Sequence, residues 1–235
     1  MKGRVKYQIF LLVVFIAVWI WAAINPIYPH DWLLENYLVF IFVPIILLSA
    51  WYFKLSNVSY TLLTIFMSLH VIGSHYTYAE VPFGYILQDW FNADRNMYDR
   101  IVHFSFGFLL AYPVREVFMR ISKAKGFWGF WFPIELTLAF SALYEVIEWL
   151  TALSVDPSAG LAFLGAQGDV WDAQKDMLLA GIGAVIAMIV TGFIRARYDK
   201  NFWREFRESF KIARNDAPLG EVAIAKLKRI STKIN

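Results

Sequence analysis

Apolar residues occur in six long runs, and shorter polar segments separate them. A helix needs roughly 20 apolar residues to cross the hydrocarbon layer of a bilayer, and each run is close to that length. The sequence therefore predicts an all-α polytopic membrane bundle of about six transmembrane helices. The expected spans are Tyr7 to Ile24, Tyr37 to Phe53, Val58 to Gly73, about Asn96 to Val114, Pro133 to Leu153 and about Asp169 to Ile194.

The composition agrees with this pattern and excludes several other classes of protein. Of the 235 residues, 59% are apolar, and the mean hydropathy of +0.49 is too high for an ordinary soluble or nucleic-acid-binding domain. The chain has no cysteine, which excludes disulfides, iron–sulfur clusters and thiol nucleophiles. Lys2, Arg4 and Lys6 precede the first run as in a secretory signal. No small-residue cleavage site follows that run, so we expect a retained anchor.

The basic residues indicate how the bundle lies in the membrane. An even number of spans places both termini on one side. Alternate segments then carry 19 Lys and Arg on the side of the termini and 3 on the other side. Because basic residues favour the cytoplasmic side, both termini are predicted to be cytoplasmic. Twelve of the 19 acidic residues fall on the opposite, outward side.

The chain divides into a transmembrane domain, residues 1–194, and a basic tail, residues 195–235. Aromatic residues recur in the tail at helical spacing among lysines and arginines; they are Tyr198, Phe202, Trp203, Phe206 and Phe210. This pattern is typical of an amphipathic helix that contacts membrane lipids at the cytoplasmic interface. The alternative is a helix that packs on the bundle.

Ionisable side chains interrupt the last three spans, where they are costly and often functional. Helical spacing places Asp99 with His103, Glu145 with Glu148, and Asp169 with Asp172 and Asp176 on one face of each span. The three groups are Asp99, Arg100 and His103; Glu145 and Glu148; and Asp169, Asp172 and Asp176. In the predicted topology all three lie in the outer third of the bilayer or at its outer surface, level with His70 and His75.

So many carboxylates at one depth cannot all be ionised without a cation or shared protons. A divalent metal is the simplest neutraliser, and the oxygen-rich set suits Mg²⁺, Mn²⁺ or Ca²⁺ better than Zn²⁺. The expected ligands are Asp99, His103, Glu145, Asp169 and Asp172. No motif for an organic cofactor is evident.

Some of these charges have structural interpretations as alternatives. Asp99 with Arg100, and Glu148 with Lys175 or Arg95, are candidates for buried ion pairs that hold the bundle together.

Two further features of the sixth span favour a structural role. Asp169 is a candidate N-cap of the helix, and Asp172 suits its positive dipole end. A stripe of small residues permits close packing with a neighbouring helix. The stripe consists of Gly181, Gly183, Ala184 and Ala187.

The leading functional hypothesis is a metal-dependent enzyme acting at the periplasmic side on a lipid-linked or phosphate-bearing substrate. Glu148 or Asp176 would act as the base, and Arg100 or Arg95 would contact a phosphate. The alternatives are a transporter of a divalent cation or proton-coupled solute, and a non-catalytic envelope factor that binds a partner or small ligand. No nucleic-acid partner is expected.

Four ordered motifs resemble a known family. They are HYTYA at 75–79, RNMYDRIVHF at 95–104, YEVIEW at 144–149 and LGAQGDVWDAQKDM at 164–177. Together they resemble the YjdF-like family of bacterial inner-membrane proteins over roughly residues 5 to 195, which implies a multi-pass protein of the inner membrane. The same succession is more distantly similar to the VanZ-like membrane proteins, whose second motif ends in Gln where this chain has Glu148.

Overall fold

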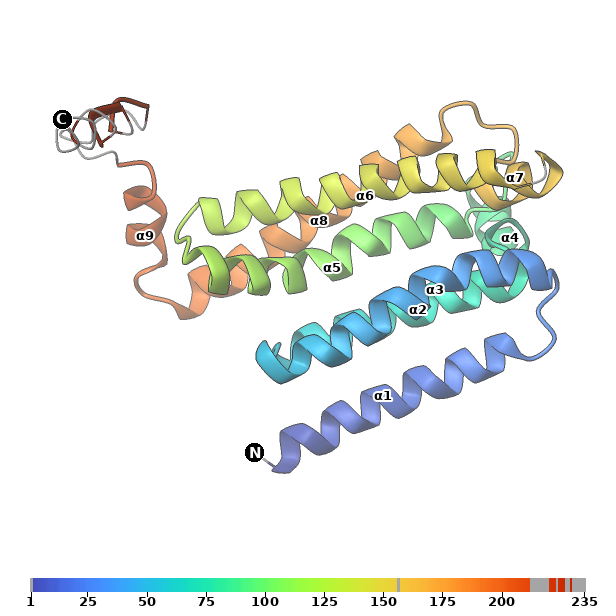
Figure 1. The fold of residues 1–235 in the computed structure, drawn as a ribbon, viewed down its shortest axis with the longest axis horizontal. Helices are drawn as coiled ribbons and strands as arrows, with labels where there is room; N and C mark the ends of the chain where they lie inside the picture. Colours follow the sequence, from blue (N-terminus) through green and yellow to red (C-terminus); the bar gives the residue numbers. More distant parts are fainter. Residues whose placement is uncertain (1, 156, 212–219, 223, 227–228, 230–235) are drawn as a thin grey trace.

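The computed structural model describes residues 2–155, 157–211, 220–222, 224–226 and 229, and within these residues the regular structure is helical (Figure 1). Six helices are long and apolar enough to cross a membrane, which confirms the predicted class and number of spans. They are α1 (Lys2–Ala23), α2 (Pro29–Tyr52), α3 (Asn57–Tyr76), α5 (Tyr98–Ser122), α6 (Trp128–Ser154) and α8 (Asp172–Tyr198). The shorter elements are η1 (Tyr78–Glu80), α4 (Pro82–Phe91), α7 (Pro157–Leu164) and α9 (Phe202–Glu208).

Two helix boundaries differ from the predicted spans in ways that change the position of an acidic residue. Helix α2 begins at Pro29, because proline is favoured in the first turn of a helix, so residues 29–36 are not the loop that the hydropathy pattern indicated. Helix α8 begins at Asp172 and not at Asp169. Glu35 therefore lies inside a span, and Asp169 lies outside one.

Helix α5 occupies the centre of the bundle and packs against α3, α6 and α8, whereas α1 and α2 pack on α3 (Figure 1). The closest approach is between α5 and α8. A Cβ atom at Gly107 would lie 1.8 Å from the carbonyl oxygen of Ala180, and one at Gly183 would lie 2.3 Å from that of Phe104. Gly183 and Ala184 of the small-residue stripe therefore make the close contact that the sequence indicated, whereas Gly181 faces Leu138 of α6.

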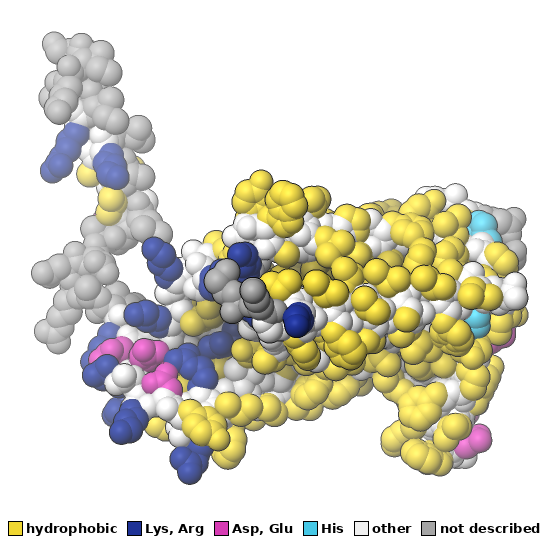
Figure 2. Space-filling model, turned by 90° about the horizontal axis from the view of Figure 1, so that it is seen from below, with side chains coloured by type: hydrophobic (Ala, Val, Ile, Leu, Met, Phe, Trp, Pro, Cys, Tyr) yellow, Lys and Arg dark blue, Asp and Glu magenta, His cyan; other side chains and the backbone are white. Residues whose placement is uncertain are grey.

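The two ends of the bundle differ in charge. Figure 2 shows Lys and Arg gathered at one end with a few acids among them, an apolar middle, and histidines with isolated acids towards the other end. The N-terminal end of α1 and helix α9 lie at the same end, as an even number of spans requires (Figure 1). The assignment of this end to the cytoplasm remains a prediction from the count of basic residues, and the opposite end is called the outer end below.

The first part of the tail packs on the bundle. Phe202 is buried against Phe130, and the Ser209 hydroxyl accepts a hydrogen bond of 3.1 Å from the Phe127 amide. Trp203 and Tyr198, in contrast, are 62% and 83% exposed. One face of the tail thus packs in the protein core. The exposed aromatic rings on its other face are available for the predicted contact with lipid, which stays a prediction.

Candidate functional site at the outer end of the bundle

The outer end is built from two segments that hydrogen bonds join. Arg95, in the segment before α5, donates to the carbonyl oxygens of Gly165 and Ala166 at 3.0 and 3.2 Å. The Asn96 amide donates to the side-chain oxygen of Gln167 at 2.9 Å, and the Gln167 side chain donates back to the Asn96 carbonyl at 3.3 Å. The loop that leads into α8 is therefore fixed to the start of α5.

Two arginines neutralise most of the aspartates at this end. Arg95 contacts Asp172 and also pairs with Asp99 at 3.1 Å. The sequence suggested Arg100 as the partner of Asp99, but adjacent residues of a helix point apart, whereas residues four apart share a face.

Arg100 is the most heavily engaged cation at the outer end. It contacts the carboxylates of three residues of the sixth-span motif: Asp169 at 2.9 Å, Asp172 at 2.7 Å and Asp176 at 2.6 Å. Its side chain is only 9% exposed. The ion pairs thus form a buried network that ties α5 to α8.

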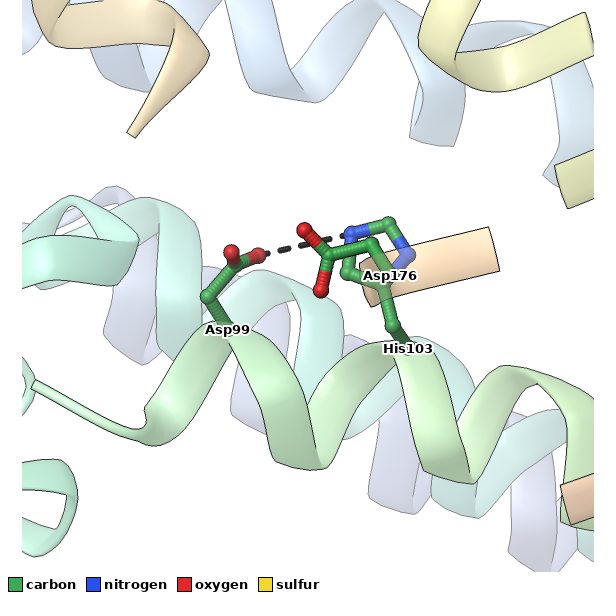
Figure 3. A group of neighbouring side chains, drawn as sticks. All are labelled: Asp99, His103 and Asp176. Atoms are coloured by element: carbon green, nitrogen blue, oxygen red, sulfur yellow. Dashed lines mark ion pairs between the residues drawn. The ribbon is translucent and has the colours of Figure 1, made fainter. Parts of the chain in front are cut away.

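A second cluster lies next to this network and contains the histidine. Asp99, His103 and Asp176 point towards one another (Figure 3), and one ligand atom from each lies within 4.8 Å of the others. Asp99 and His103 come from one face of α5, and Asp176 comes from α8. The Asp99 carboxylate is 3.4 Å from Nε2 of His103, and Glu145 of α6 is 3.6 Å from Nδ1 of the same ring.

The structure places the eight predicted site residues in two groups and leaves Glu148 apart from both. Asp99, His103 and Glu145, predicted as metal ligands, lie together with Asp176, which was predicted as a catalytic base. Asp169 and Asp172, the other two predicted ligands, contact Arg100. Glu148 lines a neighbouring cavity, described next.

The cavity lies between α2, α3, α5, α6 and α7. Its volume is about 70 Å³, counted as the space open to the centres of water molecules, which is enough for several of them. Asp99 and His103 form part of its wall. The polar groups around them are Glu35, His70, Tyr78, Tyr144 and Glu148, and the rest of the wall is mostly apolar.

Glu35 is a site residue that the sequence analysis missed. It is 7% exposed, and its Oε2 atom has no hydrogen-bond partner among the described residues. The sequence does contain a signal for it, because the apolar run of the second span continues upstream of Tyr37. The predicted boundary at Tyr37 left this acid in a loop.

His70 is engaged by its neighbours. Its Nδ1 atom is 2.5 Å from the Tyr78 hydroxyl, and its Nε2 atom is 3.1 Å from the carbonyl oxygen of Glu35. Since a carbonyl only accepts, the proton is on Nε2, and Tyr78 donates to Nδ1. Both nitrogens are thereby occupied, which makes His70 a residue that positions α2, α3 and η1.

Asp169 lies in the loop before α8, and its pKa is lowered below the ordinary value of an aspartate. The causes are the hydrogen bond from Lys175, the backbone amide of Trp171 and the nearby charge of Arg100. A group with a lowered pKa stabilises the folded protein at neutral pH, and this contribution is lost as the pH falls through the pKa in the folded state.

We expect the substitution Lys175→Met to raise the pKa of Asp169, so that the carboxylate protonates at a higher pH than in the parent. Carboxyl ¹³C NMR on aspartate-labelled protein measures this, with Asp169→Asn to assign the signal. An unchanged titration would mean that Lys175 does not determine the pKa of Asp169.

The donor set at Asp99, His103, Asp176 and Glu145 suits a hard or borderline divalent cation. Asp176 contacts Arg100 and still has a second oxygen to offer, because a carboxylate has two. The outer end also carries more acids than bases. In the network, the cluster and the cavity, the described residues include seven carboxyl groups against two arginines, one lysine and two histidines: Asp99, Asp169, Asp172, Asp176, Glu35, Glu145 and Glu148.

Comparisons with known proteins agree with the sequence motifs. The family described as predicted membrane protein (DUF2238) matches residues 7–197. The inner membrane protein YjdF of Escherichia coli (strain K12) is 37% identical over 177 residues, which cover 74% of this chain and 84% of the relative. No solved structure matches the chain. The predicted localisation, a multi-pass protein of the bacterial inner membrane, agrees with the six apolar helices and with this relative, and the chain belongs to the DUF2238 family of membrane proteins.

Proposed function

We propose that the protein is a divalent-cation-dependent membrane enzyme whose site, at the outer end of the bundle, acts on a phosphate-bearing substrate. The observation that carries the proposal is the convergence of Asp99, His103 and Asp176 from two helices, with ligand atoms within 4.8 Å, at the edge of a cavity. Glu145 is the fourth ligand in this proposal.

The surplus of carboxyl groups supports a bound cation. The arginine network already occupies Asp169 and Asp172, so their charges need no further partner. Asp99 and Asp176 also contact an arginine. Glu145, Glu148 and Glu35 have no arginine or lysine partner among the described residues, and a cation beside His103 would lower the cost of these buried like charges.

The surroundings of the cluster support catalysis in this proposal. A bound divalent cation polarises a phosphoryl oxygen and lowers the pKa of a coordinated water. Glu148 and Glu35 line the same cavity and are the candidate bases for that water. Arg100 has three carboxylate partners, so its role in this scheme is to position Asp176 rather than to bind the phosphate.

The proposal is tested by measuring metal content and turnover on the same preparations. We expect gently purified parent protein to contain about one divalent ion per chain by mass spectrometry, because the three ligand atoms share one site. Asp99→Asn and Glu145→Gln should lose this ion, and Asp89→Asn, which changes an exposed acid of α4, should retain it.

Release of phosphate from dodecyl phosphate should depend on the added metal and be lost in the same two variants. Parent protein that binds none of Mg²⁺, Mn²⁺, Ca²⁺ or Zn²⁺ would contradict the proposal. Cation flux into proteoliposomes without phosphate release would replace it with the transport function.

A further inference from the structure

On three of its helices, α2, α3 and α5, the wall of the cavity changes from polar to apolar along one direction, whereas the lining residues of α6 are polar as far as Ser141. On α5 the lining residues follow one stripe, with Asp99 and His103 at the outer end and Phe106 and Leu110 deeper in the membrane. Eleven residues separate Asp99 from Leu110, which corresponds to about 16 Å along a helix.

The two helices opposite show the same order. On α2 the lining runs from Glu35 at the outer end to Phe42, and on α3 it runs from His70 to Leu63. Three helices therefore place charged or polar groups at the same outer end and hydrocarbon at the inner end. We call this cavity the slot.

We propose that the substrate of the site is a single-chain amphiphile, with its polar head at Asp99, His103 and Asp176 and its apolar chain lying inward along α5 to Leu110. This inference rests on the proposed function, because it takes the head group to be the phosphate handled there. It adds that the substrate is a lipid and that the slot holds its chain.

The apolar inner end of the slot favours a hydrocarbon chain over a polar solute. A polar solute would lose its hydrogen bonds to water next to Phe106 and Leu110. An apolar chain loses nothing by moving from the bilayer into the slot, because lipid tails and these side chains are equally apolar. The contacts of the polar head group then determine the affinity, and the slot determines the direction of the apolar chain.

The test uses protein in lipid nanodiscs and dodecyl phosphate that carries a diazirine on its terminal carbon. After photolysis, we expect the label on the peptide segments 63–67 and 106–110. The variant Leu63→Trp fills the inner end of the slot and should reduce this labelling about tenfold or more.

Ile65→Trp is the matched control, because Ile65 is on the same helix, is 44% exposed and does not line the slot, so its labelling should equal that of the parent. Leu63→Trp should also retain the bound cation, which shows that the protein is folded. If Leu63→Trp does not fold, Leu63→Phe should show the same loss with a smaller amplitude.

A label confined to lipid-facing positions, or unchanged by Leu63→Trp, would overturn the inference. The same experiment with a terminal-diazirine dodecanol separates the two proposals. Labelling of the slot by the alcohol, in protein that binds no cation and releases no phosphate, would support the chain site and reject the enzyme.

Discussion

Replacing Arg100 by methionine is expected to lower the free energy of unfolding by about 3–5 kcal/mol, the usual cost of leaving buried charges without their partner. Arg100 is 9% exposed and contacts Asp169, Asp172 and Asp176. Methionine preserves much of the side-chain volume, so the loss reports on charge rather than on packing. Reversible unfolding in detergent micelles measures the effect.

Lys175→Met is the matched control for this variant. Lys175 also pairs with Asp169, at 2.7 Å, but its side chain is 53% exposed, so its removal should cost no more than about 1 kcal/mol. Adding Asp176→Asn to Arg100→Met should restore part of the lost stability, because one of the unpaired charges is then removed. An Arg100→Met protein as stable as the parent would show that the network does not hold α5 and α8 together.

The substitution Gly183→Ala is expected to separate α5 from α8 and to cost about 2 kcal/mol or more. The added Cβ atom would lie 2.3 Å from the carbonyl oxygen of Phe104, and a backbone atom cannot rotate away as a side chain does. Gly107→Ala should be worse, because its Cβ atom would lie 1.8 Å from the Ala180 carbonyl oxygen.

Gly181→Ala is the control on the same helix. Its Cβ atom would lie 3.6 Å from Leu138, which is ordinary contact, so this variant should match or exceed the parent in stability because alanine favours a helix. The same unfolding measurement compares all three variants. Equal stabilities of Gly183→Ala and Gly181→Ala would disprove the role of the close contact.

The glycine contact also bears on the candidate cation site. Gly107 lies four residues after His103, and Ala180 lies four residues after Asp176. The close contact between α5 and α8 is therefore one helical turn further from the outer end than His103 and Asp176. We therefore expect Gly183→Ala to lower the cation content together with the stability. A destabilised variant that retains the cation would show that the glycine contact stabilises the bundle without shaping the cation site.

The sequence predicted the number of spans because each is a long apolar run, and it predicted the shared face of Asp99 and His103 because helical periodicity is local. It could not predict that Asp176 would join them while Asp169 and Asp172 met Arg100. The sequence places all three acids on one stripe, but Asp169 precedes the start of α8, and the partners of the other two depend on how deeply α8 is set against α5.

Glu35 shows a second limit of the sequence. Its distance along the chain from the other site residues is large, and its side chain enters the cavity only because of the rotation of α2 about its own axis. That rotation follows from packing on α3 and from the contacts of His70 with Tyr78 and with the Glu35 carbonyl. Periodicity on α2 alone carries no information about those partners.

The two arginines receive most of their carboxylate partners from a part of the chain that is synthesised much later. Arg95 and Arg100 are translated about 70 residues before Asp169, Asp172 and Asp176, so of the carboxylates that they contact only Asp99 is present when they enter the membrane. The outer end of the nascent protein therefore remains charged and incomplete until the last span has been inserted. A chain that ends before residue 169 would leave Arg100 without any of these three carboxylate partners.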